Sequence, residues 1–266
     1  MVGAVRRAGL SLSALVFVLS SACGGGPRGE EARGEVPAAG VPAAADAEVD
    51  RHGHGHGHGA GAHGEGEHRH HGGHHRFEDP ERWAKEFDGP ERLRWQKPDA
   101  VIAGLGLAAD AVVADIGAGT GTFAVRFARA LPQGKVYAND VEAGMVEYLG
   151  KRAREEGLAN VTPVLGEAGD PRLPAGLDLA FMCDVFHHVE DVAGFFGHVR
   201  ESLKPGGRLV IVDFKKDAPE DAPGPPAAMR VALAEVIARL EPVGFQVERV
   251  DESLLEFQYV VVFKRT

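Results

Sequence analysis

The sequence predicts an α/β fold, in which a doubly wound, mostly parallel sheet of seven strands carries helices on both faces. Short apolar segments alternate with amphipathic helical segments from residue 111 onward, and this alternation is typical of βαβ units. A glycine-rich turn directly follows the first apolar segment. The last two expected strands, 245–250 and 257–264, are too close together for a crossover helix, so we expect the last strand to be antiparallel.

The composition excludes several other classes of protein. The chain has 29 Lys and Arg against 39 Asp and Glu, a formal net charge of −10. We therefore expect no nucleic-acid partner, because gripping phosphates requires a basic face. Two cysteines are too few for a disulfide-built fold or a Cys-rich zinc module.

Residues 1–22 predict an export signal. Arg6 and Arg7 precede an apolar run at 10–19, and small residues then lead to Cys23. This order is typical of a secretory signal, and the run is too short to span a bilayer comfortably. Small residues before a cysteine resemble the lipobox of bacterial lipoproteins, although Ser20 occupies the position usually held by Leu.

The lipobox resemblance implies lipidation of Cys23 and a place in the cell envelope, on the outer membrane or its periplasmic face. The lipid would then be the only attachment to the membrane. Two alternatives stay open. The signal is an ordinary cleaved one, or it is not functional and the protein is cytoplasmic.

Residues 23–76 predict a disordered tether. The segment is rich in Gly, Ala and Pro, and it holds ten of the 13 His of the chain. It has too little apolar surface to offset the entropy of ordering. His52, His54, His56 and His58 alternate with Gly, and neutral imidazole binds Ni and Zn. Metal buffering and merely incidental binding are equal alternatives, whereas a catalytic site would need ligands on rigid elements.

Residues 77–266 are expected to form the folded domain, which is long enough for a full core. It begins with an amphipathic helical cap at 77–104, broken at Gly89-Pro90. The Lys204-Pro205-Gly206-Gly207 sequence predicts a turn before the fifth strand. The remaining apolar and periodic segments predict strands at 111–116, 135–139, 161–165, 177–183, 208–214, 245–250 and 257–264, and helices at 122–131, 142–156, 191–203 and 227–240.

The glycine turn is the first segment with a chemical implication. It reads Asp115-Ile116-Gly117-Ala118-Gly119-Thr120-Gly121. Glycines between a strand and a helix let a ligand approach the backbone where such sheets bind ligands. Asp140 ends the second expected strand, where an acid can accept hydrogen bonds from both ribose hydroxyls. The alternatives are that the glycines serve only a tight turn and that Asp140 caps the next helix.

This glycine pattern resembles motif I of class I S-adenosylmethionine-dependent methyltransferases, which have a Rossmann-like fold. The likeness extends over about 95–265 and includes segments 166–168, 183–189 and 203–209. The N-terminal helical segments at 81–83 and 95–99 resemble those of an uncharacterised bacterial subgroup of this family. The resemblance implies S-adenosylmethionine as the cofactor. It also implies cofactor contacts from Asp115, Gly117, Ala118, Gly119, Gly121, Asp140, Val141, Glu167, Ala168 and Asp184.

Two histidines follow the fourth expected strand. In this family the cofactor carries an activated methyl group, so the protein supplies orientation and, for many acceptors, a base. Imidazole suits that role near neutral pH, which makes His188 and His187 the candidates. Consecutive residues point in different directions, so one of the pair could be structural. We expect Cys183 to be a small buried hydrophobic residue.

The sequence therefore predicts an S-adenosylmethionine-dependent methyltransferase acting on a small molecule, with the acceptor class resting on fold-level analogy. The rival hypothesis is an envelope lipoprotein that binds divalent metal through its His tract and carries a non-catalytic nucleotide-fold domain. Asp115, Asp140 and the glycine loop together favour the enzyme, since a scaffold does not need all three. The sequence carries no indication of the oligomeric state.

Overall fold

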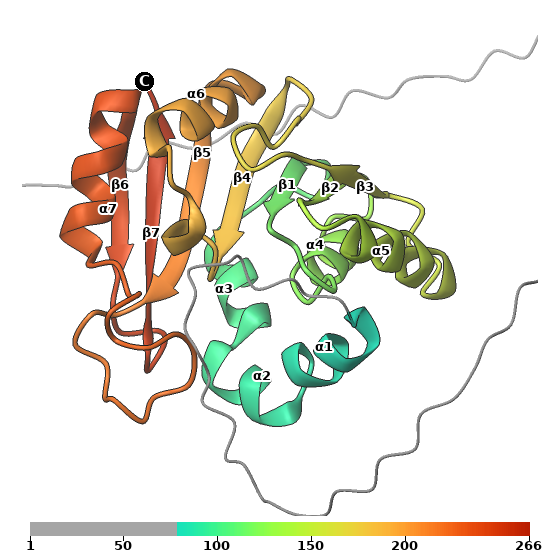
Figure 1. The fold of residues 1–266 in the computed structure, drawn as a ribbon. Helices are drawn as coiled ribbons and strands as arrows, with labels where there is room; N and C mark the ends of the chain where they lie inside the picture. The colour runs from blue at the N-terminus through green and yellow to red at the C-terminus, as the bar shows by residue number, and fades with distance from the viewer. Residues whose placement is uncertain (1–78) are drawn as a thin grey trace, which may run out of the picture. The chain divides into compact units, whose positions relative to one another are not determined.

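The computed structural model describes residues 79–266. These residues form one seven-stranded sheet with the order β3-β2-β1-β4-β5-β7-β6 (Figure 1). β7 runs antiparallel to both of its neighbours, and the other pairs are parallel. The predicted fold class is confirmed. The strands are β1 Val112–Ile116, β2 Lys135–Asp140, β3 Val161–Leu165, β4 Leu177–Cys183, β5 Leu203–Phe214, β6 Phe245–Asp251 and β7 Gln258–Arg265.

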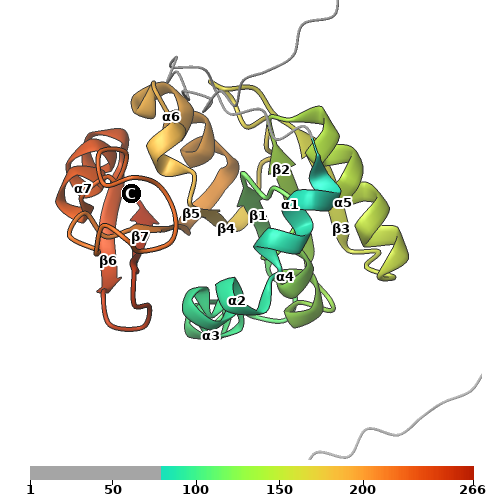
Figure 2. The same cartoon turned by 60° about the horizontal axis from the view of Figure 1, so that its bottom comes forward.

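Helices cover both faces of the sheet (Figures 1 and 2). One face packs against α3 (Pro98–Gly104), α4 (Ala124–Ala130) and α5 (Ala143–Glu155), and the other against α6 (Val192–Ser202) and α7 (Leu233–Leu240). Successive strand residues alternate between the faces. Val113 and Ala114, for example, join different core clusters. Two short 3-10 helices, η1 (Phe186–His188) and η2 (Glu241–Val243), complete the elements after the cap.

The N-terminal cap consists of α1 (Pro80–Phe87), α2 (Pro90–Gln96) and α3. The break at Gly89 was expected, but a second break occurs at Lys97, which adopts a left-handed φ of 45° before Pro98. A residue before proline is displaced from the helical region. Trp95 is buried and packs 5.7 Å from the ring of Phe214, so it joins the cap to the sheet as a core residue.

Two predicted boundaries, the starts of β5 and α7, were wrong by more than two residues. The 204–207 segment is an irregular part of β5, because Leu203 already pairs with Leu177 before the register shifts. The last helix begins at Leu233, six residues later than expected. The preceding segment is held as a loop by the buried Arg230, whose guanidinium donates to the backbone carbonyls of Ala218, Pro219 and Pro225.

Within residues 79–266, no helix has both the length and the apolarity needed to cross a bilayer.

Candidate active site

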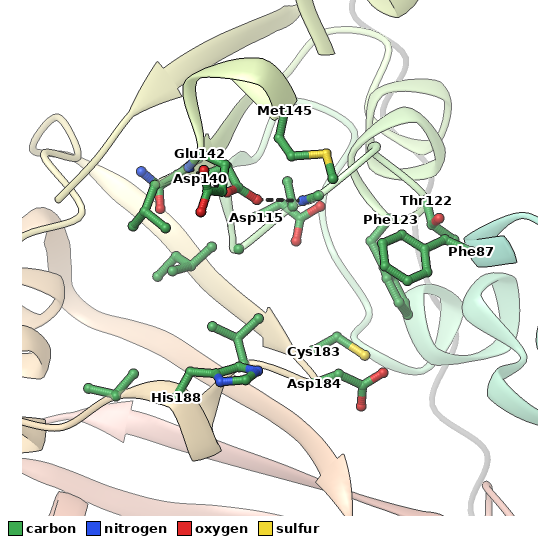
Figure 3. A pocket seen from close by; sticks show the side chains of 18 of the residues that line it. Phe87, Asp115, Thr122, Phe123, Asp140, Glu142, Met145, Cys183, Asp184 and His188 are labelled. Carbon is green, nitrogen blue, oxygen red and sulfur yellow. Dashed lines mark hydrogen bonds between the residues drawn. The ribbon is translucent and has the colours of Figure 1, made fainter. Parts of the chain in front are cut away.

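A pocket of about 250 Å³ lies at the carboxyl ends of β1, β2 and β4 (Figure 3). The strand order reverses beside β1, and ligands of doubly wound sheets bind at such a point. The loop after β1, the end of β2 and the loop after β4 supply most of the lining. Phe87, Arg92 and Gln96 contribute from the cap.

The glycine loop needs its glycines for packing as well as for access. Gly117, Gly119 and Gly121 have φ values of 68°, 55° and 93°, which L side chains rarely adopt. A Cβ on Gly117 would lie 2.4 Å from Val185 Cγ2, and one on Gly121 would lie 2.8 Å from Leu149 Cδ2. Gly117, Ala118 and Gly119 line the pocket. Gly121 is outside the lining and lets the loop pack against α5.

Asp115 is a buried carboxyl group at the floor of this loop. It is 2% exposed, and its Oδ2 has no hydrogen-bond partner within the protein. Burial raises the pKa of Asp115 to about 8, and the charge of Asp140 acts in the same direction against a backbone hydrogen bond from Ala124. A buried orphan acceptor is costly. The site is therefore suited to a ligand that brings an N–H donor or a positive charge.

Asp140 is held rigidly beside the loop. Gly119 N donates to Oδ2 at 2.8 Å and Glu142 N donates to Oδ1 at 3.0 Å. The backbone N–H of Val141 also acts on this carboxylate. Its two oxygens have about four lone-pair sites, so the group can still accept from a ligand hydroxyl. Burial raises the pKa of Asp140, although these backbone N–H groups oppose the effect.

The predicted residues after β2 and β3 separate into two groups. Val141 is 53% exposed and lines the pocket, as does Ala168. Glu167 does not line the pocket. Its carboxylate pairs with Arg172 across the turn after β3, so the structure does not bring it to the predicted cofactor position.

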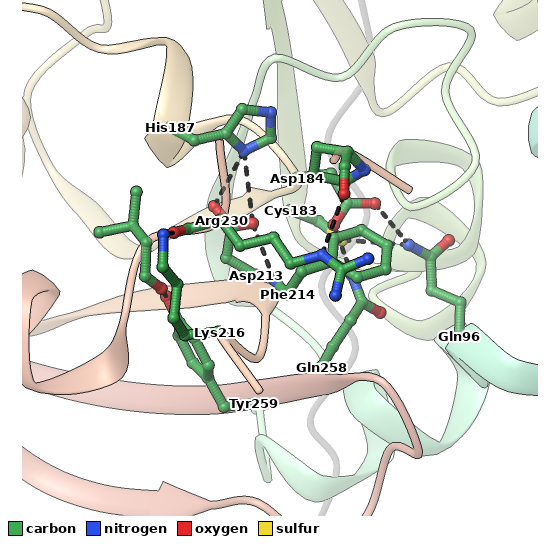
Figure 4. A network of polar contacts seen from close by, with 12 residues as sticks. Gln96, Cys183, Asp184, His187, Asp213, Phe214, Lys216, Arg230, Gln258 and Tyr259 are labelled. Carbon is green, nitrogen blue, oxygen red and sulfur yellow. Dashed lines mark hydrogen bonds and ion pairs between the residues drawn. The ribbon is translucent and has the colours of Figure 1, made fainter. Parts of the chain in front are cut away.

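Asp184 ties the cap to the sheet. It has a left-handed φ of 59°, a conformation that is strained for a non-glycine residue. Its Oδ2 accepts from Arg92 Nη2 at 2.6 Å. Oδ2 also accepts from Gln96 Nε2 at 3.0 Å, and Gln258 Nε2 donates to Oδ1 (Figure 4). Burial raises the pKa of Asp184 to about 6, against the opposing charge of Arg92.

Cys183 differs from the expected buried hydrophobic residue. It is only partly buried and lines the pocket. Gln96 Nε2 lies 3.3 Å from its sulfur. Burial and the charge of Asp184 raise the pKa of the thiol, so the side chain is a neutral thiol at physiological pH.

The structure separates the two candidate bases. His188 is exposed and lines the pocket (Figure 3). The side chain of His187 is 5% exposed, and its Nδ1 lies 3.3 Å from both carboxylate oxygens of Asp213 (Figure 4). His188 is therefore the candidate that can reach a bound acceptor.

Comparison with known proteins agrees with this geometry. Residues 114–209 match a family described as "Methyltransferase domain". A solved SAM-dependent methyltransferase from Aquifex aeolicus is 31% identical, with a TM-score of 0.65 over 71% of this chain and 99% of that chain. The chain belongs to the SAM-dependent methyltransferases. A magnesium protoporphyrin IX methyltransferase from Synechocystis, at 21% identity and a TM-score of 0.55, shares the fold.

Curated relatives of this methyltransferase match over shorter stretches. A malonyl-[acyl-carrier protein] O-methyltransferase from Hahella chejuensis is 30% identical over 37% of this chain and 34% of the relative. A ubiquinone/menaquinone biosynthesis C-methyltransferase from Francisella philomiragia is 30% identical over 46% of this chain and 49% of the relative. The chain thus spans between a third and a half of the length of these two relatives.

The residues of the methyltransferase pocket fit S-adenosylmethionine. Its lining holds four acids, Asp115, Asp140, Glu142 and Asp184, against the single arginine Arg92, which suits a ligand with a sulfonium and an ammonium group. The orphan Oδ2 of Asp115 supplies an acceptor, and the open backbone of the glycine loop supplies the cradle. Across residues 79–266, His, Cys, Asp and Glu side chains form no cluster of three or more that could bind a metal ion.

Sequence reasoning missed three residues of this site. Arg92, Gln96 and Gln258 converge on Asp184 from α2 and β7. No local pattern marks them, because the contacts join segments more than 70 residues apart. The predicted lipidation site and metal ligands lie outside the described residues. They are Cys23, His52, His54, His56 and His58, and they stay predictions.

Proposed function

We propose that the protein transfers the methyl group of S-adenosylmethionine to an O–H or N–H group of a small molecule, with His188 as the base. The observation that carries this proposal is the shared pocket. His188 lines the same cavity as Asp115, Asp140 and the glycine loop. The related proteins are named as O-methyltransferases and as a C-methyltransferase. They therefore support methyl transfer, but they do not agree on the atom that accepts the methyl group.

When bound, S-adenosylmethionine supplies an activated methyl group on a sulfonium. The glycine loop and Asp140 would hold and orient the cofactor. The aromatic rings of Phe87, Phe123 and Phe195 line the pocket and would limit the access of water to it. His188 accepts the proton of the acceptor on its imidazole, which leaves the acceptor oxygen or nitrogen a stronger nucleophile. The network around Asp184 holds the cap in place over this reaction.

Replacing His188 with Gln is expected to lower the rate of methyl transfer by roughly 10²-fold or more, because general-base catalysis contributes at least that factor. Affinity for S-adenosylmethionine should stay within about twofold of wild type, since the cofactor contacts remain. The measurement is single-turnover methyl transfer to acceptors found by screening, together with calorimetric titration of the cofactor. His198→Gln, on α6 outside the pocket, is the control. An unchanged rate in His188→Gln would assign the base elsewhere.

We also propose that the methyltransferase is held at the cell envelope by lipid on Cys23. The support is the basic start, the apolar run and the small residues before Cys23. The multiply acylated cysteine of a lipoprotein gives stable attachment, which a single acyl chain does not. Cys23→Ser is expected to abolish labelling by fatty acid and to release the protein from the membrane fraction. Unlabelled wild-type protein in the cytosol would refute the proposal.

The rival, a metal-binding envelope protein with a non-catalytic domain, draws no support from the comparisons. Its support is limited to the His tract itself. Binding of Ni or Zn by that tract is a chemical expectation, and it is compatible with an active methyltransferase domain.

A further inference from the structure

His187 and His188 are consecutive in η1 and contact each other, with ring centroids 4.1 Å apart and planes inclined by 44°. Their surroundings nevertheless differ. His188 faces the pocket, whereas the side chain of His187 is 5% exposed and turns toward the end of β5. The proposed base thus has a second imidazole against it, and that imidazole cannot itself reach a bound acceptor.

The partner of His187 is a fully buried carboxylate. Asp213 is 0% exposed, and Nδ1 of His187 lies 3.3 Å from each of its oxygens. The backbone N–H of Phe214 donates to Oδ1 at 2.8 Å. A buried carboxylate is stable as an anion only when a counter-charge and hydrogen bonds compensate it. His187 is placed to provide that charge.

The other ionisable groups around His187 come from three elements (Figure 4). Asp184 lies in the loop after β4, and its negative charge favours a charged imidazole. The hydroxyl of Tyr259 on β7 donates a hydrogen bond to the carbonyl of Val231. Two cationic side chains follow β5 in the sequence, but both donate their hydrogen bonds to backbone carbonyls. Lys216 donates to the carbonyls of residues 227 and 230, and Arg230 to those of residues 218, 219 and 225.

We propose that His187 is a positioning residue for the base. Paired with Asp213, it carries a positive charge at neutral pH, and that charge keeps the adjacent His188 neutral and able to accept a proton. This inference rests on the proposed role of His188. Two like charges about 4 Å apart repel strongly enough to move a titration midpoint by about one pH unit or more.

The electrostatics of His187 agree with this assignment. Desolvation acts to lower the pKa of its imidazole, but the hydrogen bond and charge of Asp213, together with the charge of Asp184, outweigh it and raise the pKa above the ordinary value. A proton on His187 is therefore more stable than one on a free imidazole. Any proton added to the adjacent ring must enter against the charge of the first.

The test is a titration of the full-length protein, followed by the NMR signals of the histidine rings. The His188 signal is the one that disappears in His188→Gln, and His198 on α6 serves as an internal reference. In wild type, His187 should keep its proton to higher pH than His188. In His187→Gln, the His188 midpoint should rise by about one pH unit, with the His198 midpoint unchanged.

The variant Asp213→Asn distinguishes two possible influences on the His188 midpoint, the charge on His187 and a direct effect of Asp213. This variant keeps both imidazoles but removes the counter-charge, so His187 should lose its proton first and the His188 midpoint should rise. If Asp213 acted on His188 directly, that midpoint would fall instead. A midpoint that does not rise in either folded variant overturns the inference, and Asp213→Asn alone decides if His187→Gln does not fold. The titration needs neither cofactor nor acceptor, so a failure of the proposed function would show separately, as absent cofactor binding.

Discussion

Replacing Asp115 with Asn is expected to stabilise the protein at neutral and alkaline pH and to weaken its binding of S-adenosylmethionine. Asp115 is 2% exposed, its Oδ2 has no partner within the protein, and burial raises its pKa from 3.8 to about 8. The carboxyl group therefore destabilises the unliganded fold. Asn has nearly the same shape and no charge to desolvate.

The sign of the pH dependence follows from the direction of this shift. Below about pH 4 the group is protonated in both the folded and the unfolded chain, so it has no effect. As the pH rises toward 8, the unfolded chain loses the proton and the folded chain keeps it, so stability falls. At 1.36 kcal/mol per unit, the advantage of Asp115→Asn over wild type should grow by roughly 3–4 kcal/mol between pH 5 and pH 8.

Urea denaturation of the unliganded proteins at pH 5 and pH 8 measures this difference. Asp110→Asn, at an exposed position, is the control and should stay within about 0.5 kcal/mol of wild type. Cofactor affinity should fall in Asp115→Asn, because a bound cation favours the ionised form of Asp115 and an amide cannot ionise. A stability difference that does not change with pH would show that Asp115 is not the buried, destabilising acid described above.

Gly117→Ala is expected to damage both the fold and the cofactor site, whereas Gly157→Ala should affect only the fold. The two glycines share a φ of 68°. A Cβ on Gly157 would meet nothing within 4 Å, but one on Gly117 would lie 2.4 Å from Val185 Cγ2. Left-handed backbone costs a non-glycine residue about 1–2 kcal/mol, and overpacking adds typically about 1–3 kcal/mol.

Gly157→Ala should therefore lose about 1 kcal/mol of stability and bind S-adenosylmethionine like wild type. Gly117→Ala should lose about 2–5 kcal/mol and bind the cofactor about tenfold more weakly or worse, since losing 1.4 kcal/mol of contact is tenfold. Thermal unfolding and calorimetric titration of the pair give both values. Equal losses of stability in the two variants, with cofactor affinity retained in Gly117→Ala, would contradict the expected clash between a side chain at position 117 and Val185.

The elements that the sequence predicted best are those whose signal is local. The observed bounds of β3 and β4 coincide with the expected ones, because each is a short apolar run between clear turns. The glycine loop was also predictable, since the left-handed residues it requires are glycines. The start of β5 was missed because its first pairing, between Leu203 and Leu177, depends on a neighbouring strand and not on local turn residues.

The polar network at the site is non-local, and that is why the sequence could not predict it. Asp184 was expected near the cofactor, but its contacts with Arg92 and Gln258 form only when the cap and β7 meet at one end of the sheet. The different surroundings of His187 and His188 also result from non-local contacts. His187 turns away from the pocket and pairs with Asp213, and nothing in the 183–189 segment indicates where that carboxylate lies.

The central claim is that S-adenosylmethionine binds at the carboxyl ends of the strands, around Asp115, Asp140 and the glycine loop. Calorimetric titration of the full-length protein tests this claim most directly. We expect saturable binding of S-adenosylmethionine and of its demethylated product at one site per chain, with a higher unfolding temperature in the presence of either. Folded protein that gives no binding heat and no thermal shift with both compounds would contradict the claim.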